Sequence, residues 1–388
     1  MSWAERISPQ VQTLPPSGIR RFFDIVAEMK GVVSLGVGEP DFVTPWHIRE
    51  SCVYGLQRGY TAYTSNFGLL ELRQEITNLF THKFGVSYDP RREALITVGV
   101  SEALDLAMRA ILSPGDEVLI PIPSYVSYTA CVSLAGGIPV TVPTLMENEF
   151  RVTVSQLEAL VTPRTKALLI GYPNNPTGAI MPREELEAIA AFAEKHDLIV
   201  ISDEIYGDLT YSGTHTCFSS LPGMRERTIL LNGFSKAYAM TGWRIGYALS
   251  NPDFIAAMNK IHQYTMLCAP VTGQIAAIEA LINGQHSMEK MVREYNGRRR
   301  LMVEGFRKIG LNCFEPKGAF YIFPSIKETG MTSLAFAEEL LKQEKVAIVP
   351  GDAFGESGEG FVRCSYASST ANLTEALTRI GRFIQQFR

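Results

Sequence analysis

Short apolar runs alternate with amphipathic stretches through the first two thirds of the chain. The runs are rich in β-branched side chains, which is typical of buried strands. They predict strands at residues 95–98, 117–122, 138–143, 166–173, 199–203, 228–231 and 244–250. Apolar residues at helical spacing between them predict helices over 46–59, about 70–84, 183–196 and a stretch ending near 112. Such alternation favours an α/β fold, a mostly parallel sheet covered on both faces.

The pattern changes after about residue 280. Helices are predicted over 288–309, 333–344 and the C-terminus, with strands at 346–351 and 360–369 between them. These elements indicate a smaller α+β domain. Before residue 46, a helix is expected from Ile19, with Ser17 as its cap, and a short strand within 32–42. We therefore predict a large domain of residues 46–280 and a small one that combines 1–45 with 281–388.

Polar side chains stand at or just after the ends of several predicted strands. In an open α/β sheet, ligands bind outside the carboxyl ends of the parallel strands, because these ends meet at one edge. Packing alone would not place so many polar groups along a single edge. The sequence thus predicts a ligand site formed by Ser101, Tyr125, Asn175, Asp203, Tyr206 and Lys236.

Lys236 and Asp203 form the most informative pair in this group. Lys236 follows a buried strand and lies among small and aromatic residues in the run NGFSKAYAMTGWRIGY. A partly desolvated lysine has a lowered pKa and can form a Schiff base with a carbonyl. Asp203 ends another buried strand, and a carboxylate there could keep a pyridine ring nitrogen protonated, as pyridoxal phosphate requires. The alternative for Lys236 is an ordinary surface lysine.

Several other residues have both a functional and a purely structural interpretation. The turn around Val100 and Ser101, between a strand and a helix, could present backbone N–H groups to a phosphate. Arg363 could clamp a carboxylate or be an exposed strand arginine. Tyr63 could be surface decoration or a phosphate donor, and Gly38 could approach a ligand or belong to a plain turn.

Composition narrows the function classes further. The chain has 388 residues, 46% hydrophobic and 20% charged, with a net charge of −4, so no basic field points to nucleic acid or to a membrane surface. Six cysteines lie far apart without a CxxC pair, which argues against a disulfide framework or a zinc site and fits a reducing cytoplasm. No GxGxxG or GK[ST] motif is present, and the first residues lack a signal-peptide core.

Taken together, the motifs resemble one family. YTSNFGLLELR, SPGDEVLIPIPSY, YPNNPTG, SDEIYGDLTY, GFSKAYAMTGWRIGY and KGAFYIFP are similar to segments of the class I pyridoxal-phosphate aminotransferases, in their aspartate and aromatic branch. The resemblance covers nearly the whole chain. It implies the aspartate aminotransferase fold, with a seven-stranded sheet in the large domain, and pyridoxal 5'-phosphate as cofactor.

The resemblance also implies roles for residues around the cofactor ring. Lys236 would hold the cofactor as a Schiff base and move the proton in catalysis, and Asp203 would pair with the ring nitrogen. Asn175 and Tyr206 would bind the phenolate oxygen of the ring, with Tyr206 also counted as catalytic. Tyr125 would stack on the ring, where many relatives carry Trp or Phe.

At the phosphate and substrate ends, further positions match the family. Val100, Ser101, Glu102 and Arg244 would hold the phosphate. Relatives often carry glycine where this chain has Val100, and some carry serine at Gly233, three residues before the lysine; Ser235 could compensate.

The remaining positions concern the substrate and the partner subunit. Tyr63 would reach the phosphate of a partner subunit's cofactor, so the protein would be a homodimer. Arg363 would bind the substrate carboxylate, with Gly38 and Asn175 assisting. Residues 17–21 would close over the substrate, with Ile19 against its side chain; the arginines that follow could meet a dicarboxylate or be solvated.

The expected function is therefore a cytoplasmic aminotransferase without a metal. It would move the amino group of an L-amino acid, aspartate, aromatic or similar, to a 2-oxo acid, expected to be 2-oxoglutarate, by a ping-pong mechanism through pyridoxamine phosphate. Two alternatives remain open: a carbon–sulfur lyase of the same fold, and a non-enzymatic sensor that binds the cofactor. The second would need a DNA-binding module before the fold, and the segment before residue 30 is too short for one.

Overall fold

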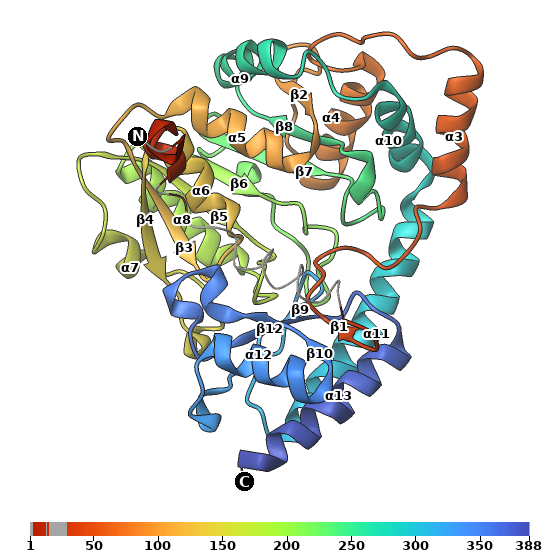
Figure 1. The fold of residues 1–388 in the computed structure, drawn as a ribbon. Helices are drawn as coiled ribbons and strands as arrows, with labels where there is room; N and C mark the ends of the chain where they lie inside the picture. The colour runs from red at the N-terminus through yellow and green to blue at the C-terminus, as the bar shows by residue number, and fades with distance from the viewer. Residues whose placement is uncertain (1–2, 13, 15–28, 388) are drawn as a thin grey trace.

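A seven-stranded sheet lies at the centre of the larger part of the protein (Figure 1). The structure, a computed structural model, describes residues 3–12, 14 and 29–387. The strand order is β2-β8-β7-β6-β5-β3-β4, and only β8 runs antiparallel to its neighbours in this sheet. The strands are β2 (Ala94–Thr97), β3 (Glu117–Ile122), β4 (Ile138–Pro143), β5 (Thr165–Gly171), β6 (Ile199–Asp203), β7 (Thr228–Gly233) and β8 (Gly246–Leu249). The predicted mostly parallel sheet is confirmed.

Helices cover both faces of this sheet, as its apolar strands require. Successive residues of β5 point to opposite faces, so that Ala167 and Leu169 join one core while Leu168 and Ile170 join another. The first face is covered by α5 (Gly99–Ile111), α6 (Ser127–Leu134) and α9 (Pro252–Thr265). The second is covered by α4 (Leu70–Phe84), α7 (Val154–Glu158), α8 (Arg183–Lys195) and α10 (Val271–Asn283). Outside them, α3 (Trp46–Gln57) packs on α10.

The C-terminal part forms a smaller α+β unit below the sheet in Figure 1. Its antiparallel sheet has the order β11-β12-β9, and β10 pairs in parallel with β1. Its elements are α11 (Gln285–Ile309), α12 (Ser333–Glu344), α13 (Thr370–Ile384), β9 (Tyr321–Ile322), β10 (Val346–Ala347), β11 (Val349–Pro350) and β12 (Val362–Ser365), joined by β1 (Val33–Ser34). Among the described helices, none is both long and apolar enough to cross a membrane.

Several local predictions were incomplete or wrong. The strand predicted at 346–351 is two strands, β10 and β11, because the chain changes partner at Ile348. The strand expected within 32–42 has only the two residues of β1. Helices α6, α7, α9 and α10 were missed, although α9 has a clear start: Asn251 caps its first turn and Pro252 opens it. The helix expected from Ile19 lies outside the described residues.

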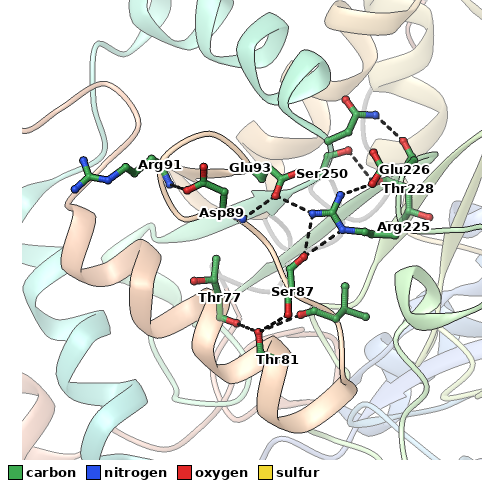
Figure 2. A network of polar contacts seen from close by, with 12 residues as sticks. Thr77, Thr81, Ser87, Asp89, Arg91, Glu93, Arg225, Glu226, Thr228 and Ser250 are labelled. Carbon is green, nitrogen blue, oxygen red and sulfur yellow. Dashed lines mark hydrogen bonds and ion pairs between the residues drawn. The ribbon is translucent and has the colours of Figure 1, made fainter.

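A polar network connects the amino ends of β2 and β7, on the side of the sheet opposite the carboxyl ends of its parallel strands (Figure 2). Arg225 donates to the Ser87 carbonyl at 2.9 Å and to Glu93 Oε2 at 2.8 Å, and Glu93 also accepts from the Asp89 backbone N–H. Its guanidinium lies over the Tyr88 ring, 4.9 Å from the centroid. Because Arg225 has three kinds of partner here, replacing it would leave Glu93 partly buried without its counter-charge.

Candidate active site

One cavity of about 570 Å³ lies at the carboxyl edge of the sheet. Its walls come from the ends of β5, β6 and β7, the first turn of α5 and, across the gap, the C-terminal part. All the strand-end residues that the sequence predicted to converge do line it: Ser101, Tyr125, Asn175, Asp203, Tyr206 and Lys236. Parallel topology, with crossover connections between strands, explains why residues so distant in sequence meet here.

Lys236 lies at the inner wall of the cavity. Its Nζ donates to the Gly38 carbonyl at 2.8 Å and lies 5.9 Å and 5.8 Å from the ring centroids of Tyr206 and Phe320. Burial lowers the pKa of Lys236 to about 8, and neighbouring arginine charges add to this effect. A substantial fraction of the amine is therefore unprotonated, and nucleophilic, just above neutral pH.

Asp203 ends β6 and is only 6% exposed. Its Oδ2 accepts from the Tyr128 hydroxyl at 2.8 Å, and its Oδ1 accepts from the Ile205 backbone N–H at 3.2 Å. Burial raises the pKa of Asp203 to about 6, although both hydrogen bonds work in the opposite direction. Tyr128, which lies 75 residues before Asp203 in the chain, was not predicted as a site residue. Its place at the start of α6, shortly after the predicted site residue Tyr125, was the available signal.

Tyr206 and Tyr321 share a hydrogen bond of 2.7 Å between their hydroxyls. Both are buried, and burial raises the pKa of Tyr206 well above its ordinary value, so this phenol stays protonated at neutral pH. Tyr321 was also missed, although it belongs to the aromatic run KGAFYIFP. A Cβ on Gly38 would lie 2.6 Å from the Tyr321 hydroxyl, so glycine is required where this loop crosses the cavity wall.

Arg363 is a buried cation on β12 and is only 3% exposed. It donates from Nη1 to Asn175 Oδ1 at 2.9 Å and from Nη2 to the Gly36 carbonyl at 2.6 Å. Its guanidinium lies 4.6 Å from the Tyr321 ring centroid and 4.9 Å from that of Phe354. Within the described residues its Nε has no acceptor. The exposed-arginine reading is therefore wrong, and the geometry suits the carboxylate reading.

The start of α5 forms the opposite end of the cavity. Val98, the residue before the helix, provides no side-chain cap, so the first helical N–H groups lack an internal partner. Gly99 has a φ of 78°, and a Cβ there would lie 2.5 Å from Arg244 Nη2, so the arginine packs directly on this turn. Val100 and Ser101 stand in the wall beside it. Free N–H groups and a guanidinium together suit a phosphate.

One departure from the family pattern, Gly233 in place of serine, is explained by packing at this end. A Cβ on Gly233 would lie 2.9 Å from the Ile245 carbonyl and 3.2 Å from Val100 Cγ2, so serine would not fit without a shift of β8. Ser235 stands in the cavity wall instead, two residues further along.

Two predicted positions do not line this cavity, and a third lies outside the described residues. The Glu102 side chain does not line it: Oε1 contacts His262 Nδ1 at 2.7 Å. Tyr63 is 82% exposed and does not line the cavity of its own chain. Ile19 and the rest of segment 17–21, with its two arginines, lie outside the described residues.

The charges in the cavity have no ion pairs. Within the described residues, no acid or base lies within 4.0 Å of Asp203, Lys236, Arg244 or Arg363 to form an ion pair. Each instead has neutral hydrogen-bond partners. Arg244 is exposed, whereas Asp203, Lys236 and Arg363 are buried or partly buried. Unpaired buried charges are costly, and they persist where a ligand supplies the missing partner. The set fits a ligand with a carbonyl, a basic ring nitrogen and a phosphate beside an anionic substrate.

The known proteins that this chain matches are aminotransferases, which agrees with the geometry of the site. The family model described as aminotransferase class I and II matches residues 30–380. An aspartate aminotransferase of Pyrococcus abyssi is 47% identical and an aromatic-amino-acid aminotransferase of Thermococcus litoralis 45% identical, each over 98% of both chains. A solved structure of aspartate aminotransferase from Thermus thermophilus with maleate has a TM-score of 0.93 at 39% identity, covering 97% of this chain and 99% of that one.

The chain belongs to the class I and II aminotransferases. It is a pyridoxal-phosphate-dependent transaminase of the aspartate aminotransferase fold, related to aspartate and aromatic aminotransferases over its full length. The fold class, family and cofactor predicted from the sequence are confirmed.

The raised pKa of Asp203 makes a prediction for the cofactor-free protein. Unfolded Asp203 ionises near pH 3.9 but folded Asp203 near 6, so between these values the folded protein binds more protons, and its stability falls as the pH rises. We expect Asp203→Asn to raise the melting temperature at pH 7, by an amount that disappears below about pH 4. The gain is on the order of 3 kcal/mol, at about 1.4 kcal/mol per pKa unit.

Thermal unfolding of cofactor-free protein from pH 4 to 8 measures this difference. Asp197→Asn is the matched control, since the Asp197 side chain is 96% exposed and should show no such pH profile. A melting-temperature difference for Asp203→Asn that stays constant across this range would contradict the prediction.

Proposed function

We propose that this transaminase moves the amino group of an L-amino acid to 2-oxoglutarate by a ping-pong mechanism. The observation that carries the proposal is the set of charges without ion pairs around one cavity, whose lining includes Lys236, Asp203 and Arg363. When bound, pyridoxal phosphate supplies an electron sink and carries the amino group between two half-reactions. The remaining work falls to the side chains of this chain.

At the reacting end, Lys236 attaches the cofactor and moves a proton to and from the substrate Cα. Its lowered pKa favours the free amine that both tasks need. Asp203 would pair with the ring nitrogen and stabilise its protonated form, and a cation there would offset the cost of burying the carboxylate. Tyr128 and the Ile205 N–H hold that carboxylate in place.

Around the ring, Asn175 and Tyr206 donate to its phenolic oxygen. The Asn175 oxygen is taken by Arg363, which leaves its amide N–H groups free to donate, and Tyr206 keeps its proton because its pKa is raised. Tyr125, whose ring meets that of Tyr128 edge to face with centroids 5.7 Å apart, lines the cavity and would stack on the ring. At the other end, Ser101, the N–H of Val100 and Arg244 bind the phosphate.

For the substrate, Arg363 binds the α-carboxylate. The Tyr321 and Phe354 rings give its guanidinium a fixed orientation. A carboxylate would accept from the Nη1 and Nη2 N–H groups that Asn175 and Gly36 leave free. Gly38 forms the wall beside it. We also propose Ile19 as a contact of the substrate side chain. The names of the relatives cover both aspartate and aromatic donors, so both classes belong in an assay.

The same proposal includes the arrangement of the protein. We infer a homodimer in which Tyr63 reaches the phosphate of the partner's cofactor. The 82% exposure of Tyr63 supports this, as do the exposed aromatic residues near it in the sequence, such as Tyr60 and Tyr54. The large domain covers 46–280, and the small one 1–45 with 281–388. A cytoplasmic location is supported by the six free cysteines, which a reducing compartment preserves.

Subunit mass provides a direct check of the homodimer. Sedimentation of the holoenzyme should give about twice the chain mass of 42.9 kDa, and Tyr63→Phe should weaken cofactor binding without changing that mass. A monomer that retains full activity at assay concentration would contradict the shared site.

Attachment of the cofactor is the second check. Borohydride should reduce the holoenzyme to an adduct on Lys236, because this amine is the only one in the cavity wall among the described residues. Lys236→Ala should lower the rate by on the order of a thousandfold or more, while Lys342→Ala, at a 76% exposed lysine, should not. Peptide mapping that finds the adduct on another lysine would refute the assignment.

The dependence on an oxo-acid acceptor separates a transaminase from a carbon–sulfur lyase. Without acceptor, an active L-amino acid donor should release about one oxo acid per active site and then stop; adding 2-oxoglutarate should restart turnover. Aspartate, phenylalanine, tyrosine and cystathionine form a suitable panel. Continuous release of ammonia without acceptor would identify the lyase.

A further inference from the structure

A buried polar pair lies directly behind the turn that opens α5. Glu102 is in the first turn of α5, and its side chain is 9% exposed; His262, on α9, is fully buried. His262 Nδ1 contacts Glu102 Oε1 at 2.7 Å, and Glu102 Oε2 accepts from the backbone N–H of Val98. The two contacts form a chain from α9 through a carboxylate to the residue just before the helix.

The surroundings of His262 identify which of its two ring nitrogens carries the proton. Its Nε2 is buried and has no hydrogen-bond partner among the described residues. A proton on Nε2 would therefore lie buried without an acceptor, and Nδ1 would present a lone pair to a carboxylate. A proton on Nδ1 avoids both costs. His262 Nδ1–H thus donates to Glu102.

The position of Glu102 matters for the cavity. Glu102 belongs to the first turn of α5, whose Val100 and Ser101 line the proposed phosphate end of the cavity, yet its own side chain does not line the cavity. Turned toward that end, a carboxylate would repel a phosphate and compete for the same N–H groups. In its observed position it instead satisfies Val98, the one N–H of the turn that precedes the helix.

We propose that His262 is a positioning residue for cofactor binding: by donating to Glu102, it keeps the carboxylate on the Val98 N–H and away from the phosphate end of the cavity. This inference rests on the proposed phosphate role of the α5 turn. His262 touches neither cofactor nor substrate, and acts through Glu102 alone.

Two substitutions separate this role from simple packing. His262→Phe keeps an aromatic ring in the same space but removes the donor, whereas His262→Asn loses the ring but keeps an amide N–H near the position of Nδ1. Both are compared in the full-length cofactor-free protein by titration with pyridoxal phosphate and with pyridoxal, which lacks the phosphate. Lys260→Ala, at an exposed position of α9, is the control.

If the proposal holds, His262→Phe weakens pyridoxal phosphate binding by roughly tenfold, the effect of losing one hydrogen bond to a charged group. It leaves pyridoxal binding within about twofold of wild type, and His262→Asn retains most of the phosphate-dependent affinity. Should His262→Phe fail to fold, His262→Leu removes the same donor and should show the same selective loss. Adding Glu102→Gln to either variant removes the carboxylate that would repel the phosphate, so it should restore most of the lost affinity.

Opposite outcomes overturn the proposal. Equal losses for pyridoxal phosphate and pyridoxal would assign His262 a general packing role, as would a larger defect in His262→Asn than in His262→Phe. Wild-type affinity in His262→Phe would also overturn it. A wild-type protein that binds pyridoxal but gains nothing from the phosphate would refute the phosphate role of the α5 turn itself, which distinguishes failure of the proposed function from failure of this inference.

Discussion

The active site depends on one physical constraint: charged side chains line one cavity without forming ion pairs to one another. Asp203 and Arg363 are almost fully buried, and Lys236 is partly so, yet each is held by neutral partners. Burial shifts the pKa of Asp203 upward and that of Lys236 downward. Had these groups paired with each other, neither would be available to a ligand, so their separation by phenols, amides and backbone groups is what preserves the site.

The fold keeps Arg363 apart from Asp203 and Lys236, because it belongs to a different sheet. Asp203 and Lys236 come from the carboxyl ends of adjacent parallel strands, while Arg363 comes from the antiparallel sheet of the C-terminal part. Tyr321, between them, contacts both Tyr206 and Arg363 and forces glycine at position 38. The cavity therefore lies between the two sheets. Its two halves are joined by the Tyr206–Tyr321 and Arg363–Asn175 hydrogen bonds and not by an ion pair.

Much of this could be predicted from the sequence, because Lys236, Asp203 and Asn175 follow strands whose apolar pattern is plain. Tyr128, Tyr321 and His262 could not, since their partners lie 75, 115 and 160 residues away and no local pattern records such pairs. Glu102 was correctly placed at the α5 turn, but the direction of its side chain depends on His262. The roles of Tyr63 and Ile19 remain proposals, because they concern a partner subunit and residues outside those described.

The most direct measurement is a crystal structure of the protein with pyridoxal phosphate and maleate, a dicarboxylate that stands in for the substrate. If the ligands supply the missing partners, a maleate oxygen will lie within about 3 Å of a guanidinium nitrogen of Arg363, and Asp203 will lie within hydrogen-bonding distance of the ring nitrogen. Maleate bound away from Arg363, with Asp203 away from the ring, would contradict the central claim that ligands complete these buried charges.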